Sequence, residues 1–108
     1  MAHESQLIYN QAMKLARKII LHSPVSDERL LDQFVEDCLR DKVSLIAVVG
    51  PACERIEEMI DEIVVGDGSD DERYVTTSSH PDEPLSDVIE FVEHWEMERG
   101  DPLQVVRL

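Results

Sequence analysis

The chain has 108 residues and a mass of 12.3 kDa, which is enough for one domain with a modest core and too little for two. Hydrophobic residues make up 43% of the sequence, which excludes a disordered chain. The formal net charge of −14 argues against direct binding of nucleic acids, because such a chain repels phosphates. Basic proteins or multivalent cations are the partners that this charge attracts.

The negative charge is concentrated in the second half of the chain. Residues 1–52 carry seven acidic and six basic residues, a net charge of −1, whereas residues 53–108 carry seventeen and four, a net charge of −13. Such a charge can simply keep a protein in solution, or it can dock a basic partner. Both interpretations stay open at this point.

Cysteine content and apolar runs bear on the compartment. Two cysteines, Cys38 and Cys53, are too few for a disulfide framework and favour a reduced, intracellular protein. The N-terminus lacks a basic segment followed by an unbroken apolar stretch, and no apolar run approaches the roughly 20 residues of a membrane span. We therefore expect a cytoplasmic protein without a signal peptide or a membrane contact.

The first half of the chain predicts two helices and two strands. Residues 4–16 have apolar side chains at approximately helical spacing, and residues 18–23 read as a short buried strand that Pro24 ends. Ser26 can cap a second helix, and residues 43–50 form an apolar run typical of a strand covered on both faces. The buried face of the second helix is expected to consist of Leu30, Leu31, Phe34, Val35 and Cys38.

The second half repeats the alternation. Residues 54–65 predict an amphipathic helix, residues 66–72 a turn, and residues 73–78 a third strand. A further helix follows Pro84, and residues 103–108 predict a final strand. The outer faces of these two helices are acidic and carry Glu57, Glu58, Asp61, Glu62, Glu90 and Glu93.

This order of elements predicts an α/β fold. We expect one domain over residues 1–108, a small three-layer α/β sandwich of about four mostly parallel strands, like half of a Rossmann-like or flavodoxin-like fold. An extra N-terminal helix within residues 1–16 precedes an alternating core over residues 17–108. The sequence does not determine strand order; we expect 2-1-3-4, and the last strand could pair antiparallel.

Three loops that follow strands are the expected site, because open α/β sheets bind ligands at the carboxyl ends of their strands. These loops bring His22, Ser79, Asp82, Cys53 and His80 to one edge. Cys53 opens a helix, which favours its thiolate, and a histidine could serve as its base in nucleophilic catalysis. Alternatively, Cys53 is a small residue that packs the first helical turn beside acidic neighbours.

We expect no metal and no cofactor. His22, Cys53, His80 and Asp82 are acceptable zinc ligands, but their spacing matches no metal motif. The acidic turn over residues 66–72 lacks the EF-hand pattern, and the segment GPAC, with one glycine, lacks a nucleotide-binding motif.

The segment YVTTSSHPDEPL, residues 74–85, combines a strand end with a helix start. Asp82 and Glu83 are placed to satisfy the free amides of the next helix, and Pro84 suits its first turn. This interpretation accounts for the carboxylates and leaves His80 unexplained.

Four segments carry a resemblance to a known family: GPAC at 50–53, DDERYV at 70–75, His80, and DEPLSDVIEF at 82–91. They resemble short acidic bacterial proteins that are defined only as a domain of unknown function. The similarity covers roughly residues 43–95, and this chain has Ser79 where the family tends to have Trp before the His. The resemblance implies the α/β fold and a bacterial or phage-like setting, and it implies no activity.

Two functions from different classes follow. The favoured hypothesis is a non-catalytic module of the inhibitor, immunity or nucleic-acid-mimic type, whose acidic second half docks a basic protein surface. The alternative is a small enzyme or ligand-binding domain that uses Cys53 and His80 in the strand-end loops. A homodimer formed through an apolar helix face is compatible with both.

Overall fold

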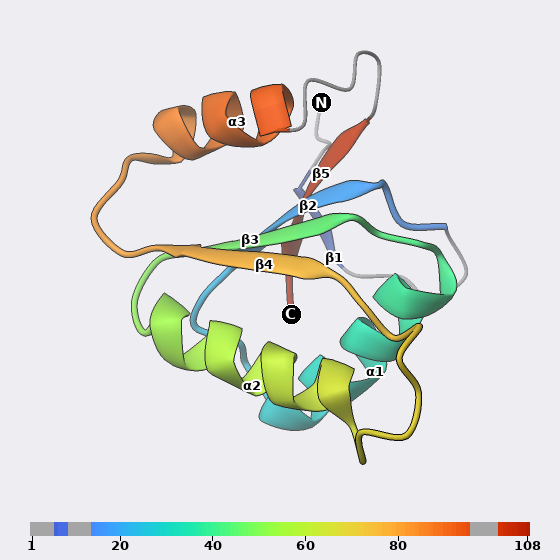
Figure 1. Ribbon diagram of the computed structural model, residues 1–108. Helices are drawn as coiled ribbons and strands as arrows, with labels where there is room; N and C mark the ends of the chain where they lie inside the picture. Colours follow the sequence, from blue (N-terminus) through green and yellow to red (C-terminus); the bar gives the residue numbers. More distant parts are fainter. Residues whose placement is uncertain (1–5, 9–13, 96–101) are drawn as a thin grey trace.

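The computed structural model describes residues 6–8, 14–95 and 102–108. Within these residues one sheet of five parallel strands is covered by three helices, which confirms the α/β fold (Figure 1). The strands are β1 (Gln6–Ile8), β2 (Lys18–His22), β3 (Leu45–Val49), β4 (Thr76–His80) and β5 (Leu103–Arg107), and the helices are α1 (Glu28–Arg40), α2 (Cys53–Val65) and α3 (Leu85–His94).

The strand order is β1-β5-β2-β3-β4. The four strands predicted from the sequence correspond to β2, β3, β4 and β5 and lie in the order 4-1-2-3 when they are numbered along the chain. The predicted order 2-1-3-4 is therefore wrong. Helices α1 and α2 are short crossovers that each place the next strand beside the last, so β2, β3 and β4 are neighbours. The segment containing α3 then returns across the sheet to β5, which pairs in parallel with β2. The last strand is therefore parallel as well.

The direction of these connections sets the layers. Crossovers between parallel strands are right-handed, so two that run in the same direction put α1 and α2 on the same face. The return crossover runs the other way and puts α3 on the opposite face (Figure 1). The sheet is thus covered by two helices on one face and by one on the other.

Each face of the sheet has its own apolar core. Phe34 of α1 and Ile60 of α2 pack with Val48 of β3 on the first face, and all three are fully buried. Val88 and Val92 of α3 pack on the second face against a smaller set that includes Ala47 and Ile20. The predicted buried stripe of α1 is confirmed except for Leu30, which is 45% exposed in the first turn of the helix.

The predicted N-terminal helix is not confirmed. Gln6–Ile8 form β1, and residues 14–16 belong to no helix or strand; the remaining residues of the range 4–16 lie outside the described residues. Strand β1 pairs in parallel with the outer edge of β5. That edge has unpaired backbone groups, and pairing satisfies them, which local helical spacing cannot anticipate.

Two expected helix starts are also corrected. Asp27, and not Ser26, caps α1 by accepting the Arg29 backbone N–H at 2.9 Å. Pro84 is the N-cap residue of α3, and no side chain caps that helix. Asp82 and Glu83 therefore do not cap α3, because the Glu83 carboxylate bonds a histidine instead. No helix within the described residues is long and apolar enough to cross a bilayer.

Candidate functional site

The carboxyl ends of β3 and β4 form the point where the chain connections diverge. Strand β3 leads to α2 on one face, whereas β4 leads to α3 on the other (Figure 1). In open α/β sheets such a divergence opens the crevice that holds ligands. The predicted loops are therefore at the expected end of the sheet, and the side chains there decide what chemistry it offers.

A row of residues crosses this end of the sheet in register: Arg107 of β5, His22 of β2, Val49 of β3 and His80 of β4. Alternate residues of a strand share a face, and Ile20 and Val49 pack against α3, so both histidines lie on the α3 face. Their strands are separated by β3, which puts the two backbones about 10 Å apart.

His80 is 7% exposed, and each of its ring nitrogens lies within hydrogen-bond distance of a side chain. Its Nε2 atom lies 2.9 Å from the Ser78 hydroxyl, and its Nδ1 atom lies 2.6 Å from a Glu83 carboxylate oxygen. The imidazole also packs on the Phe91 ring of α3, with centroids 5.1 Å apart and planes tilted by 55°. The histidine that the sequence left unexplained therefore ties β4 to the start of α3.

His22 has a different environment. Burial lowers the pKa of its imidazole, and the positive charge of Arg107 lowers this pKa further. Its Nε2 atom is buried and has no hydrogen-bond partner among the described residues. Both effects favour the neutral form of the ring.

The structure does not bring Cys53 together with either histidine. Cys53 is 1% exposed as the first residue of α2 and packs in the core between the sheet and α1 and α2, across the sheet from the His80 ring. Ser79 alternates with His80 and so faces the α2 side, while Asp82 is exposed in the loop. The predicted site residues therefore do not come together: Cys53 and Ser79 lie on the α2 face of the sheet, and the two histidines lie on the α3 face.

The other thiol, Cys38, is fully buried in the same core. Burial raises the pKa of Cys38, and the carboxylates of Asp37 and Asp41 raise it further. Among the described residues, no three His, Cys, Asp or Glu side chains are grouped so as to hold a metal ion.

The ends of β2 and β3 are joined backbone to backbone. The Ser23 N–H donates to the Val49 carbonyl at 2.8 Å, and the Ser23 hydroxyl donates to the Pro51 carbonyl. Gly50 has a φ of +95°, and a Cβ at this position would overlap the Ser23 carbonyl oxygen. A glycine is needed here by both the backbone angle and the close approach.

Sequence reasoning missed the relay formed by Ser78, His80 and Glu83. Ser78 and His80 are two residues apart on a strand, so they share a face, and Glu83, just before the N-cap of α3, reaches back to His80. The order hydroxyl, Nε2, Nδ1, carboxylate is that of the triads used in acyl transfer. The spacing Ser-x-His-x-x-Glu is the signal from which this relay could have been found.

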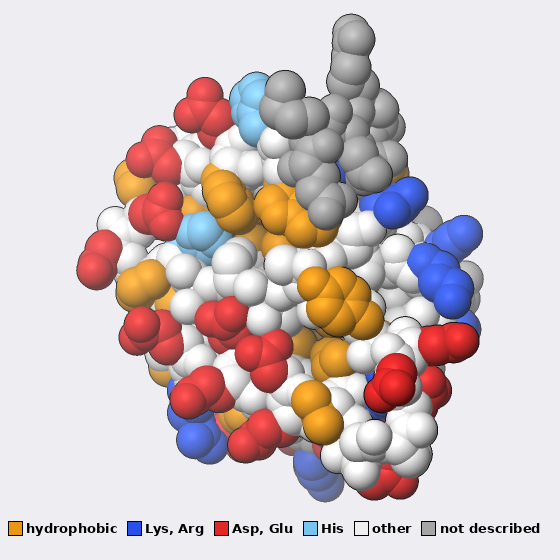
Figure 2. All heavy atoms as spheres, viewed as in Figure 1, with side chains coloured by type: hydrophobic (Ala, Val, Ile, Leu, Met, Phe, Trp, Pro, Cys, Tyr) orange, Lys and Arg blue, Asp and Glu red, His pale blue; other side chains and the backbone are white. Residues whose placement is uncertain are grey.

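Strand β4 is an edge strand and is flanked by carboxylates. The Thr77 hydroxyl lies 3.0 Å from a Glu57 oxygen and 2.7 Å from an Asp61 oxygen, both on α2. A hydroxyl has one hydrogen, so it can donate to only one of the two at a time. Figure 2 shows acidic side chains above β4, over α3, and below it, over α2.

The basic side chains around β4, α2 and α3 do not neutralise the acidic ones. Residues 53–95 contain fourteen acidic residues and two basic ones. Arg55 lies 3.4 Å from Glu28, and Arg73 lies 2.8 Å from Glu36, so both are paired with carboxylates of α1. The residues expected to meet a partner have solvent access: Glu57 is half-buried, and the exposed ones are Glu58, Asp61, Glu62, Glu90 and Glu93.

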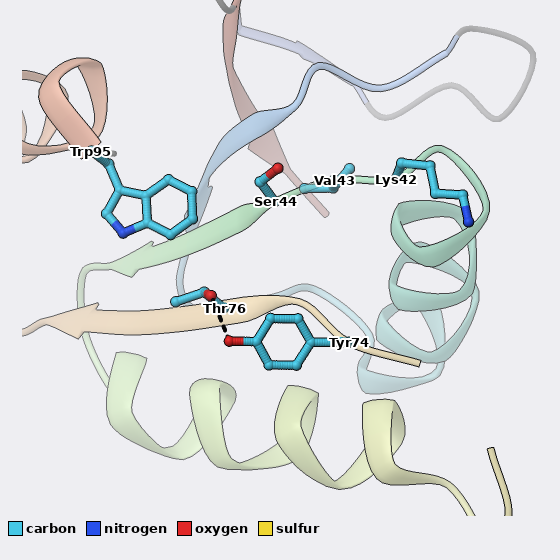
Figure 3. A pocket seen from close by; sticks show the side chains of 6 residues that line it. All are labelled: Lys42, Val43, Ser44, Tyr74, Thr76 and Trp95. Atoms are coloured by element: carbon cyan, nitrogen blue, oxygen red, sulfur yellow. Dashed lines mark hydrogen bonds between the residues drawn. The ribbon is translucent and has the colours of Figure 1, made fainter. Parts of the chain in front are cut away.

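A pocket lies at the opposite end of β3 and β4, where the sequence predicted nothing. It has a volume of about 280 Å³ and is bounded by the Trp95 ring on one side and by Tyr74 on the other (Figure 3). The Tyr74 hydroxyl lies 3.2 Å from that of Thr76, and Tyr74 is 73% exposed. Lys42, Val43 and Ser44 complete the lining.

Comparison with known proteins gives a family and no activity. No curated protein and no solved structure matches the chain. The model of one family, described as Domain of unknown function (DUF7684), matches residues 3–106. The match spans nearly the whole chain and confirms the resemblance to a family of unknown function, so the protein belongs to the DUF7684 family.

Proposed function

We propose that the protein is a binding module that docks a basic protein surface through its acidic second half, as inhibitors, immunity proteins and nucleic-acid mimics do. The observation that carries this proposal is the surface around β4, where the carboxylates of Glu57, Asp61 and Glu83 all contact side chains of the edge strand. The surplus of twelve acidic over basic residues in the range 53–95 extends that surface over α2 and α3.

Electrostatics explains why such a surface suits a basic partner. Carboxylates that crowd one hydroxyl repel each other, and a partner's Lys or Arg would relieve this repulsion. Complementary charge also steers association and makes its rate depend on salt. Both cysteines are free and buried, which supports the reduced, cytoplasmic setting that we propose for this interaction.

The test compares two pairs of substitutions with the same change in net charge. Glu58→Gln with Glu62→Gln removes two negative charges from the exposed face of α2, and Asp71→Asn with Glu72→Gln removes two from the turn that follows it. A basic protein captured from an extract of the source cells at low salt is purified, and its Kd is measured at several salt concentrations.

The α2 variant is expected to bind at least tenfold more weakly, and the turn variant within about threefold of wild type, since only close charges couple strongly. Partners that are not basic, or a Kd that is indifferent to salt, would contradict the proposal.

A second function, acyl hydrolysis, is favoured by the relay alone. In this reaction the Ser78 hydroxyl attacks an acyl carbonyl, its proton passes to His80 Nε2, and Glu83 stabilises the resulting imidazolium. The leaving group takes that proton, and water then releases the acyl group from Ser78 by the same steps. In this second function the relay of Ser78, His80 and Glu83 takes the place of the predicted pair of Cys53 and His80, because the sheet separates those two residues.

A fluorophosphonate probe tests the second function. Labelling at Ser78, located by peptide mass spectrometry and lost in His80→Asn, would support catalysis. An unlabelled wild-type protein would instead leave the relay as a structural link between β4 and α3.

A further inference from the structure

The outer edge of β4 has free backbone groups. The Thr76 N–H donates to the Ser44 carbonyl at 3.1 Å, so Thr76, Ser78 and His80 direct their backbone groups toward β3. Thr77 and Ser79, which alternate with them, direct theirs away from the sheet. No described residue pairs with this edge. An edge of this kind is a template for an added strand.

Carboxylates line the free edge on both sides. Glu57 and Asp61 contact Thr77 on the α2 side, and Glu83 contacts His80 on the α3 side. In Figure 2 acidic side chains lie directly below the band of uncoloured atoms along β4, over α2, whereas hydrophobic atoms and a histidine lie directly above it and the acidic side chains over α3 lie further to the left. An added strand alternates its side chains between these two sides, so each side would place them next to a carboxylate.

The pocket lies beside the first residue of the same strand. Thr76 begins β4 and lines the pocket together with Tyr74 and Trp95 (Figure 3). Lys42 at the far end of the lining disfavours a cationic occupant, whereas the two aromatic side chains favour an apolar one. A segment that runs along the edge of β4 therefore passes a site for one large apolar side chain.

We propose that the partner presents an extended basic segment that pairs with the free edge of β4. Its backbone bonds to Thr77 and Ser79, its Lys or Arg side chains meet Glu57, Asp61 and Glu83, and one apolar side chain enters the pocket between Tyr74 and Trp95. This inference rests on the proposed function and specifies how the basic partner binds.

A second copy of the chain is the obvious competing occupant of the edge. Pairing of two β4 edges would bring the carboxylates beside Thr77 and His80 of one copy against those of the other. Like charges at an interface oppose association. Charge complementarity therefore favours the basic segment.

The probe for this proposal is a synthetic nine-residue peptide in which pairs of Lys alternate with pairs of Val, so that both faces of the extended strand carry Lys, with one Leu at an end. Binding is followed by ¹H–¹⁵N correlation spectra of the protein and by calorimetry at low salt. A second peptide of the same sequence is N-methylated at alternate residues, which blocks backbone pairing on one edge and leaves every charge in place. We expect shifts concentrated at Thr77 and Ser79, and at least tenfold weaker binding of the methylated peptide.

Protein variants test the edge from the other side. Ser79→Pro removes a backbone donor that points away from the sheet, a change that edge strands tolerate, and Ser79→Ala is its matched control. Ser79→Pro is expected to weaken binding at least tenfold, and Ser79→Ala by less than twofold. If Ser79→Pro fails to fold, the methylated peptide decides with the wild-type protein alone.

The outcomes separate this inference from the proposed function. If Glu57→Gln with Asp61→Asn weakens peptide binding while Ser79→Pro and the methylated peptide do not, edge pairing is overturned and acidic docking stands. If that charge variant binds like wild type, acidic docking falls as well. Absence of shifts along β4 at millimolar peptide overturns edge pairing, as does a dimer in sedimentation that Ser79→Pro dissociates.

Discussion

The two faces of the sheet differ in size and in chemistry. Among the described residues, sixteen buried side chains form the core under α1 and α2, and seven form the core under α3. The α3 face also contains three polar side chains of the sheet, Lys18, His22 and His80. The corresponding positions under α1 and α2 are mostly apolar. One helix cannot cover the area that two cover, and on this face the hydrogen bonds of Lys18 and His80 add to the smaller apolar core.

Lys18 shows how the smaller face is held. Its side chain is 1% exposed, and its ammonium donates to the carbonyls of Trp95 at 3.1 Å and Glu93 at 3.5 Å. These carbonyls belong to the last turn of α3, where helices have unsatisfied acceptors and a partial negative charge. A buried lysine thus anchors the C-terminus of the only helix on this face within the described residues.

The largest expected effect lies on the larger face. Phe34→Ala removes a fully buried ring and should lower the free energy of unfolding by about 3–5 kcal/mol. Val88→Ala, at a fully buried position under α3, should cost about 1–2.5 kcal/mol because fewer buried atoms are removed. Urea unfolding followed by circular dichroism measures both. Equal losses would contradict the expectation that the loss grows with the number of buried atoms removed.

The next effect is on the lysine that anchors α3. Lys18→Met keeps the length of the side chain and removes its donors, so we expect a loss of about 1–3 kcal/mol. Amide exchange within Leu85–His94 should accelerate more than exchange in α2, since only α3 loses its anchor. Uniform acceleration in all helices would show that Lys18 acts on the whole fold.

His22 predicts a pH dependence confined to the α3 face. Its pKa in the fold is lowered, so below about pH 6.5 the unfolded chain binds the proton more readily, and stability falls as the pH falls. The slope from one proton cannot exceed about 1.4 kcal/mol per pH unit. His22→Asn should remove this component of the slope in urea titrations. Arg107→Gln should reduce it, because it removes the second cause of the shift.

The smallest expected changes in stability concern the helices α1 and α2, which cover the face with the larger core. Two residues that flank these helices have left-handed backbone angles. Lys42 follows α1 with a φ of +62°, and Ala52 precedes α2 with a φ of +60°. Each substitution to Gly should raise stability by roughly 0.5–1 kcal/mol. Gly66→Ala should lower stability, because a φ of +59° with a ψ of −127° suits glycine and not a residue with a Cβ, and it provides the opposite sign in the same thermal scan.

Local patterns predicted the fold class because the core stripes of α1 and α2 and the apolar run of β3 are properties of neighbouring residues. Strand β1 was missed because it exists only by pairing with β5, almost 100 residues further along the chain. Strand order also escaped, since it depends on the direction in which the segment around α3 crosses the sheet.

The candidate site was predictable in position and not in composition. The row containing His22 and His80 follows from strand ends that the sequence shows. The sequence does not show that Glu83 bonds His80, because a carboxylate just before a helix is also the pattern of a helix cap. Cys53 was placed with the histidines because a sequence does not tell which face of the sheet a helix covers.

The position of Trp95 has a practical consequence. It is the only tryptophan of the chain, and it lines the pocket beside β4. Nearly all fluorescence excited at the red edge of the protein's absorption therefore originates at this one place. The fluorescence of Trp95 therefore reports whether the pocket at the amino end of β4 is occupied, and no dye has to be attached.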